Sequence, residues 1–193
     1  IPGLDSHAAA LLREQELRAA AATLGVAEVQ FLGYHDGDLA TVDTGEAVAK
    51  ITQIMRGVHL QVVITFGPDG ISGHPDHIAV HRWTTLAFDR AGLSARLFYL
   101  APSEATFQGC GVPPAEQASG RPVAGIDVAG YLVTKVRAMQ CHVSQRPPYP
   151  GRPEDEAERL ACHEYFTLAR PTTMTNDLDD LFAGINGTTS TNT

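Results

Sequence analysis

The chain has 193 residues, 44% of them hydrophobic and 19% charged, a composition typical of one soluble globular domain with a substantial core. Its formal net charge of −8 argues against a nucleic-acid or anionic-membrane surface, because such surfaces gather basic side chains. We therefore expect no nucleic-acid partner.

The cysteines and the first residues of the chain indicate the cellular compartment of the protein. The three cysteines show no Cys-x-x-Cys spacing and cannot all pair with one another, which favours a reducing compartment. No apolar run approaches the roughly 18 residues of a membrane span, and the first residues lack a signal-peptide pattern. We therefore expect a cytoplasmic protein without a membrane span, and a homo-oligomer stays open. The first residue is Ile1 rather than Met, which we interpret as a processed or truncated chain.

Helical and extended patterns alternate along the first half of the chain. Ala, Leu, Arg and Glu favour a helix near the N-terminus, and a β-branched run favours a strand near residue 64. The expected elements are a helix over residues 8–24 stopped by Gly25, a strand over 29–32, a helix over 45–58 capped by Thr44 or Asp43, a strand over 62–66 and a helix over 75–90 closed by Gly92.

The second half continues the alternation after a long loop. The expected elements are a strand over 96–100, a surface loop over 101–122, a strand over 123–128, a helix over 129–142 capped by Asp127, and a helix or strand over 156–168. Such alternation predicts an α/β fold with a mainly parallel, Rossmann-like sheet flanked by helices. We expect a single domain over residues 1–170 and a polar tail over 171–193, of which only 178–185 is apolar enough to dock.

A Gly-rich loop after the strand at 62–66 carries the residues that indicate chemistry. It contains three glycines and ends in His74, Asp76 and His77, with His81 one helical turn further on. Histidine and aspartate bind zinc and transfer protons near neutral pH. A solvated helix start with Asp76 as N-cap is the alternative, but an ordinary helix start does not need so much backbone freedom.

The residues from Gly70 to His77 resemble the LmbE-like, or PIG-L, zinc-dependent de-N-acetylases, in which a Gly-rich loop ending in His-Pro-Asp-His follows a central strand. The resemblance implies that His77 binds zinc, that His74 acts as general acid and oxyanion stabiliser, and that Asp76 pairs with His74. We expect these three side chains to cluster at the C-terminal edge of the sheet, facing a cleft.

A second stretch is similar to the family's R-x-x-E helix and the Leu-Gly-Tyr-x-Asp turn that follows it. It runs from Arg13 and Glu16 to Asp36. The resemblance implies that Arg13 and Asp36 hold sugar hydroxyls and line the same cleft as His77. The alternatives are a solvated pair of Arg13 and Glu16 on a helix face and ordinary turn chemistry for Asp36.

A third stretch, residues 135–145, is similar to the family's helix end with the pattern K-x-x-A-L-x-x-H-x-S-Q. It adds His142 and Gln145 to the substrate-binding candidates. A histidine near a helix C-terminus is also stabilised by the helix dipole, which explains His142 without any role in binding.

The N-terminal region departs from the family pattern. Family members begin with a buried strand ending in Ala-His-Pro-Asp-Asp-Glu, which supplies the other zinc ligands and the general base. Nothing in residues 1–12 matches it, so we interpret the first strand as missing. As given, the chain is expected to bind zinc weakly.

The sequence predicts a metal-dependent hydrolase that removes an acetyl group from an N-acetylated amino sugar or glycoconjugate. Zinc is the expected cofactor, and Fe²⁺ also accepts such ligands. The alternative is a catalytically inactive carbohydrate-binding or structural remnant of the same fold. A nucleotide binder ranks last, because neither G-x-G-x-x-G nor G-K-[ST] occurs.

Overall fold

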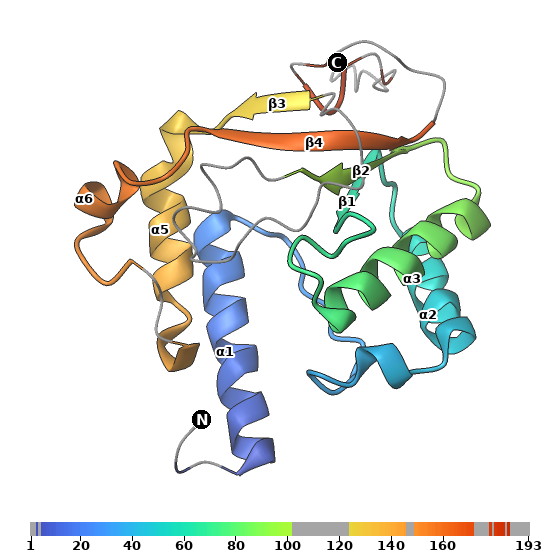
Figure 1. Cartoon of the computed structure of the whole chain (residues 1–193), viewed down its shortest axis with the longest axis horizontal. Helices are drawn as coiled ribbons and strands as arrows, with labels where there is room; N and C mark the ends of the chain where they lie inside the picture. The colour runs from blue at the N-terminus through green and yellow to red at the C-terminus, as the bar shows by residue number, and fades with distance from the viewer. Residues whose placement is uncertain are drawn as a thin grey trace, which may run out of the picture. The chain divides into compact units, whose positions relative to one another are not determined.

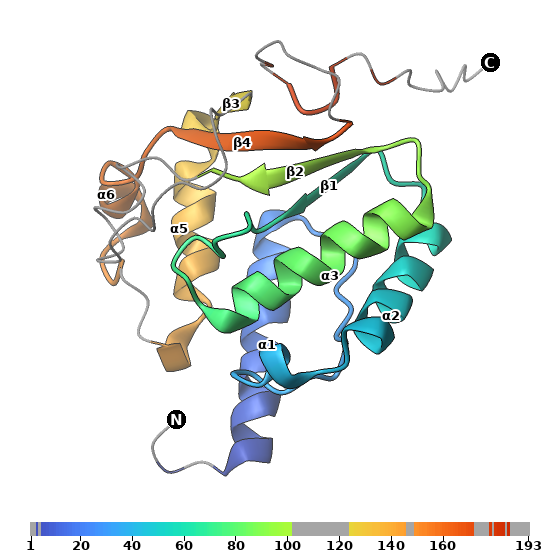
Figure 2. The same ribbon diagram turned by 45° about the vertical axis from the view of Figure 1, so that its right-hand side comes forward.

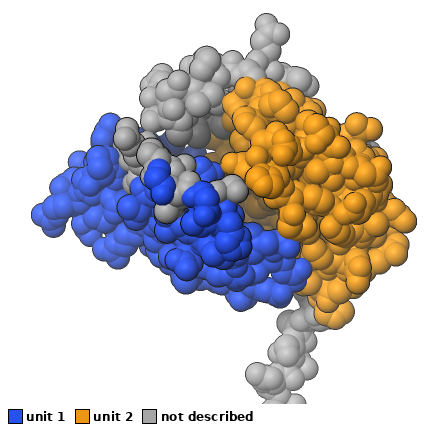
Figure 3. All heavy atoms as spheres, turned by 90° about the horizontal axis from the view of Figure 1, so that it is seen from below, with its two compact units in different colours: residues 1–31, 104–111, 127–163 blue, residues 32–103, 112–126, 164–193 orange. Residues whose placement is uncertain are grey.

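The structure, a computed structural model, describes residue 3 and residues 5–101, 124–145, 149–171, 178, 180–183 and 185. The chain divides into two compact units, which we call unit 1 (residues 1–31, 104–111 and 127–163) and unit 2 (residues 32–103, 112–126 and 164–193; Figure 3). Each unit has a buried apolar cluster of its own. The single domain over residues 1–170 stays a prediction.

The elements follow the alternation that the sequence predicts. In chain order they are α1 (Ser6–Leu24), a 3-10 turn (Leu39–Thr41), α2 (Thr44–Gly57), β1 (Val62–Thr65), α3 (Pro75–Ala91), β2 (Arg96–Leu100), β3 (Ala124–Asp127), a 3-10 turn (Ala129–Tyr131), α5 (Leu132–Gln140), a 3-10 turn (Val143–Gln145), α6 (Pro153–Ala157) and β4 (His163–Arg170). Among the residues described, no helix is both long and apolar enough to cross a membrane.

The four strands form one sheet in the order β1-β2-β4-β3 (Figure 1). β2 lies parallel to β1, with Val62 opposite Arg96, and antiparallel to β4. The α/β fold is therefore confirmed. The sheet is mixed rather than mainly parallel, because β4 pairs with β2 in the antiparallel direction. The region predicted as helix or strand over 156–168 overlaps the end of the short helix α6 and most of β4.

Helices α2 and α3 lie side by side in unit 2 and pack against β2 (Figure 2). Both begin as predicted: the side chain of Asp43 accepts a hydrogen bond from the amide of Glu46, and Pro75 occupies the first turn of α3. Trp83 and Leu97 are almost completely buried between these elements.

The predicted strand over residues 29–32 is wrong, since this segment has no regular secondary structure. A β-branched apolar pattern forms a strand only beside another strand, and within the described part of the chain none pairs with it. Tyr34 anchors the following turn instead: its ring lies 5.4 Å from that of Trp83, and its hydroxyl donates to Glu46 at 3.3 Å.

The elements of the second half agree with the sequence where they are described. The helix predicted over 129–142 begins as a 3-10 turn, followed by α5. The carboxylate of Asp127 accepts a hydrogen bond from the amide of Ala129, but the predicted cap is wrong, because the N-cap residues of the two elements are Val128 and Tyr131. The predicted docking of residues 178–185 is confirmed at Leu178 and Leu181, which pack beside Phe98. The buried Arg96 also donates to the carbonyl groups of Leu181 and Ala183. The loop predicted over 101–122 lies outside the described residues from 102 on.

Candidate active site

The connection from β1 to α3 brings its backbone directly against the first turn of the helix. Gly70 has a φ of +62°, and a Cβ atom on it would lie 2.9 Å from the Cβ of His77 and 3.0 Å from the backbone nitrogen of Ile78. Glycine alone combines this φ with so close an approach at little cost. The carbonyl oxygen of Gly70 contacts Nδ1 of His77 at 3.1 Å. Gly70 therefore fixes where the His77 ring lies.

The neutral rings of His77 and His81 carry their proton on Nδ1. Nδ1 of His77 faces the carbonyl of Gly70, and Nδ1 of His81 faces the carbonyl of Phe66 at 2.9 Å. Because a carbonyl oxygen only accepts, each ring must donate from Nδ1. Nε2 then keeps its lone pair, and this is the tautomer in which a histidine binds metal.

His77 lies beside the end of β1, because its ring stacks on Phe66, the residue after the strand. The two ring centroids are 4.2 Å apart and the ring planes differ by 5°. The ring of His74 follows at 5.0 Å from that of His77. The expected clustering of these side chains near the C-terminal end of a strand is thus present within unit 2.

His74 takes the opposite tautomer. It caps α3, and its Nδ1 accepts the backbone N–H of Asp76 at 3.2 Å. The proton of the neutral ring is therefore on Nε2, which can donate, and His74 is an exposed residue. One helical turn thus presents an acceptor nitrogen on His77 and a donor nitrogen on His74.

The carboxylate of Asp76 is buried and binds main-chain amides. Its Oδ2 accepts from the N–H of Gly37 at 2.7 Å, and its Oδ1 accepts from that of Leu39 at 3.1 Å. The resemblance implies a carboxylate that pairs with His74, but among the described contacts Asp76 meets His74 through its amide. We therefore correct that expectation: Asp76 fastens the turn that carries Asp36 to the start of α3.

The described residues could supply only part of the ligand set that a metal ion needs. His77 offers a ligand nitrogen in the required tautomer, held by a backbone carbonyl as metal-binding histidines commonly are. Within the described ranges, however, no group of three or more His, Cys, Asp or Glu side chains could hold an ion. His77 is therefore a single candidate ligand rather than one member of a complete described set.

A second polar cluster lies in unit 1, around Glu16 on α1. Glu16 is only 6% exposed, and its two carboxylate oxygens accept from the backbone N–H of Ser144 at 2.6 Å and from the Ser144 hydroxyl at 2.7 Å. Burial raises the pKa of Glu16, but these hydrogen bonds and the positive charges of His142 and Arg13 outweigh it, so the pKa lies below its ordinary value. The interpretation of Glu16 as a solvated partner of Arg13 is therefore wrong.

Three of the four substrate-binding candidates belong to this cluster. Nε2 of Gln145 lies 3.3 Å from Nδ1 of His142, and the charges of His142 and Arg13 both act on Glu16. Asp36, the fourth, belongs to unit 2. A cleft that Arg13 and Asp36 share with His77 stays a prediction. The sequence did not indicate the Glu16–Ser144 contact, because the two residues are 128 positions apart.

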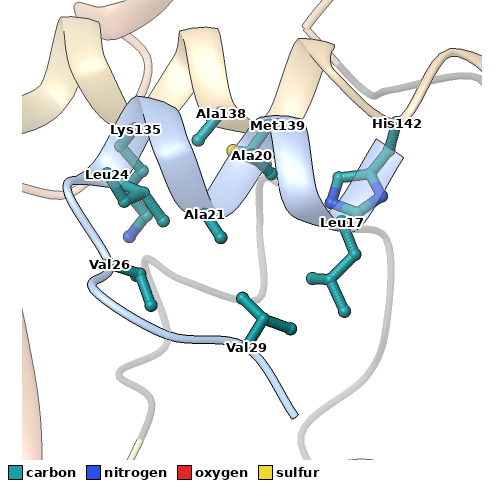
Figure 4. A pocket seen from close by; sticks show the side chains of 10 residues that line it. All are labelled: Leu17, Ala20, Ala21, Leu24, Val26, Val29, Lys135, Ala138, Met139 and His142. Atoms are coloured by element: carbon teal, nitrogen blue, oxygen red, sulfur yellow. The ribbon is translucent and has the colours of Figure 1, made fainter. Parts of the chain in front are cut away.

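An apolar pocket of about 440 Å³ opens on unit 1 beside this cluster (Figure 4). Helices α1 and α5 supply most of its lining, and the segments that follow each of these helices supply the rest. The lining residues are Leu17, Ala20, Ala21, Leu24, Val26, Val29, Lys135, Ala138, Met139 and His142. The spacing of Leu17, Ala20, Ala21 and Leu24 is that of one helix face, a signal that the sequence contains. His142 thus lies between an apolar pocket and the polar cluster.

Gly70→Ala should destabilise the protein by more than Gly73→Ala does. Both glycines have a positive φ, but nothing lies within 4 Å of a Cβ on Gly73, whereas a Cβ on Gly70 meets His77 and the Ile78 backbone. We expect about 1 kcal/mol for the change of φ alone and at least about 1 kcal/mol more at Gly70 for the clash. Denaturant unfolding of the two variants measures the difference, and equal losses would contradict the close approach.

Asp76→Asn should lower the free energy of unfolding by about 1–3 kcal/mol, because asparagine replaces one of the two acceptor oxygens with an NH2 donor and leaves one backbone N–H without its acceptor. The matched control is Asp38→Asn, in the same turn, where the carboxylate is exposed and makes no capping hydrogen bond. The control should stay within about 0.5 kcal/mol of the wild type. Equal unfolding curves for both variants would show that the hydrogen bonds from Gly37 and Leu39 to Asp76 do not stabilise the fold.

Glu16→Gln should lose stability at neutral pH and match the wild type more closely in acid. A carboxylate whose folded pKa lies below its unfolded pKa stabilises the fold above the unfolded value, and this contribution disappears as the pH falls through the folded value. Urea unfolding from pH 7 down to pH 3 measures the difference between the two proteins. Glu14→Gln, at an exposed ion pair with Arg18, serves as control. A pH-independent difference would contradict the lowered pKa.

Similarity to known proteins covers residues of both clusters. Residues 3–88, which include Glu16 and the start of α3, match the protein family described as PIG-L, GlcNAc-PI de-N-acetylase. The chain is 31% identical to a 1D-myo-inositol 2-acetamido-2-deoxy-alpha-D-glucopyranoside deacetylase of Saccharomonospora viridis, over 88% of this chain and 76% of the relative. A protein of the same name from Rhodococcus opacus is 29% identical over the same shares of the two chains.

A crystal structure of a conserved protein from Thermus thermophilus is similar in fold. It superposes with a TM-score of 0.59 at 22% identity and covers 86% of this chain and 76% of that one. The structural similarity shows that the two proteins share a fold, and the sequence identity to the deacetylases shows the family. The chain therefore belongs to the PIG-L de-N-acetylase family.

Proposed function

We propose that the protein hydrolyses the acetamide of an N-acetylated amino sugar linked to a polyol. The proposal is carried by the two histidines on one turn of α3, which take opposite tautomers next to the end of β1. The relatives are named as deacetylases of an N-acetylglucosaminyl inositol, which fits a substrate of this class.

His74 is the donor in this scheme. Its Nε2–H is suited to bind the amide oxygen and to stabilise the negative charge that develops there during hydrolysis. Its Nδ1 is occupied by the N–H of Asp76, which fixes the ring and keeps the proton on Nε2. The role of oxyanion stabiliser is thus better supported by the contacts than that of general acid, since releasing the proton from Nε2 requires another on Nδ1.

His77 is the candidate ligand for zinc, and its ring is held by the carbonyl of Gly70 and by stacking on Phe66. Proteins of this family are generally metal-dependent, and bound zinc supplies a water of lowered pKa and polarises a carbonyl group. Fe²⁺ accepts the same ligand and is the alternative metal. Asp76 supports both histidines by fastening the turn at Gly37 to the helix.

Arg13, Asp36, His142 and Gln145 are the candidates for contact with substrate hydroxyl groups. Their donors and acceptors are of the kind that binds sugars, and three of them gather around Glu16. The partner is a small amino-sugar conjugate. A cytoplasmic location and a homo-oligomer stay predictions.

A carbohydrate-binding protein without catalysis is the second candidate. One observation favours it: within the described ranges no three side chains gather that could hold a metal ion. Binding of the substrate without release of acetate by metal-loaded protein is the outcome that this candidate predicts.

The test is release of acetate from 1D-myo-inositol 2-acetamido-2-deoxy-alpha-D-glucopyranoside by zinc-loaded protein, with metal content measured in parallel. We expect His77→Ala to lose both the metal and the activity, and His74→Ala to keep the metal and lose about 10²–10³ in kcat, the usual effect of removing one oxyanion donor. His59→Ala, at an exposed position two residues after the end of α2, is the control for histidine content. Full metal content in His77→Ala would remove it as a ligand, and unchanged kcat in His74→Ala would exclude its role.

A further inference from the structure

We propose that Glu16 is a positioning residue for substrate recognition, in that its buried carboxylate holds the segment His142–Gln145 in the conformation that binds the hydroxyl-rich part of the substrate. The inference rests on the proposed function and assigns a role to a residue that neither the sequence patterns nor the relatives' names give one.

The two hydrogen bonds to Glu16 fix both the backbone and the side chain of Ser144. Oε1 of Glu16 accepts the backbone N–H at 2.6 Å, and Oε2 accepts the hydroxyl at 2.7 Å. Two short bonds from one carboxylate to one residue leave the peptide little freedom to rotate. The short 3-10 turn Val143–Gln145 is therefore held from α1 as well as from the end of α5.

The residues near Ser144 carry polar groups suited to a hydroxyl-rich ligand. His142 is half-buried and Gln145 is exposed, with 3.3 Å between the imidazole Nδ1 and the amide Nε2. Arg13 lies one helical turn before Glu16, so its exposed guanidinium belongs to the same end of unit 1. A guanidinium, a carboxamide and an imidazole together suit a dense set of hydroxyl oxygens, as in a polyol.

Packing alone does not explain a buried charge at this position. Ala20, Ala21 and Ala138 are buried where α1 meets α5, and they bring the helices together without polar groups. Burying a carboxylate costs several kcal/mol unless hydrogen bonds compensate for the lost water. Ser144 supplies that compensation to Glu16 with two hydrogen bonds, and the anionic form of Glu16 is favoured at neutral pH. The charge thus serves the conformation of the Ser144 segment.

The experiment compares Glu16→Gln, Ser144→Ala and the double variant in the full protein. Calorimetric titration with 1D-myo-inositol 2-acetamido-2-deoxy-alpha-D-glucopyranoside gives Kd, and the acetate assay gives KM and kcat. We expect Kd and KM to rise about tenfold in each single variant, which corresponds to the loss of one hydrogen bond to a charged group, with kcat unchanged within about twofold. The double variant should be no weaker than Glu16→Gln alone, because the hydroxyl bond that Ser144→Ala removes is one of the two bonds of the Glu16 carboxylate.

Two further variants separate positioning from general stability. Ser144→Thr keeps the hydroxyl and the amide, so it should retain the wild-type Kd. Glu14→Gln removes an exposed carboxylate from the same helix and should leave Kd and kcat unchanged. Ser144→Ala leaves the main-chain bond in place, so a folded variant is expected even if Glu16→Gln unfolds.

The outcomes distinguish this inference from the proposed function. Lower thermal stability with unchanged Kd and KM would overturn the inference and leave Glu16 a purely structural residue. A wild type that binds the compound without releasing acetate overturns the deacetylase proposal, and the Kd values then still decide the role of Glu16. A wild type that neither binds nor hydrolyses it overturns both.

Discussion

Main-chain groups hold every polar side chain in the first two turns of α3. The amides of Gly37 and Leu39 bind the carboxylate of Asp76, and the carbonyl groups of Gly70 and Phe66 bind the two following histidines. A carbonyl oxygen cannot donate and an amide N–H cannot accept, so these partners dictate the protonation pattern of the side chains that they bind. The chemistry proposed for the loop is therefore set by the backbone path of the connection between β1 and α3, and by the glycine that permits this path.

The cluster around Asp76 and the cluster around Glu16 are built in the same way, although they lie in different units. In each, a buried carboxylate accepts two hydrogen bonds from a segment that is distant in sequence, and the residues proposed to meet the substrate lie beside that segment. Asp76 fastens the turn next to Asp36, and Glu16 fastens the turn next to Gln145. Carboxylates suit this task because both of their oxygens only accept, whereas one polar atom of an amide side chain is a donor and a hydroxyl has a single oxygen. The side chains proposed to contact the substrate can then change rotamer while the backbone that carries them stays fixed.

Local signals in the sequence predict most of the fold. The caps at Asp43 and Gly92 and the His-Pro-Asp-His helix start depend on residues within a few positions of one another. The strand over 29–32 failed because a strand depends on its neighbours, and β-branched residues alone do not supply one. The partners of Asp76 and Glu16 could not be predicted, because a backbone amide carries no residue-specific signal. For the same reason the tautomers of His74 and His77 follow only from the three-dimensional path of the loop.

The Glu16–Ser144 contact also has a consequence for how the chain folds. The two residues are separated by 128 positions, and nearly all of the strands and helices of unit 2 lie between them. During synthesis α1 leaves the ribosome long before α5, and an isolated helix is marginally stable in water. Its apolar face, including Leu17 and Leu24, is then without the helix that it packs against. Closing so long a loop is a late and slow step. The cluster around Glu16 is therefore completed only after the chain has been synthesised as far as Ser144, and the apolar face of α1 stays uncovered until α5 is present.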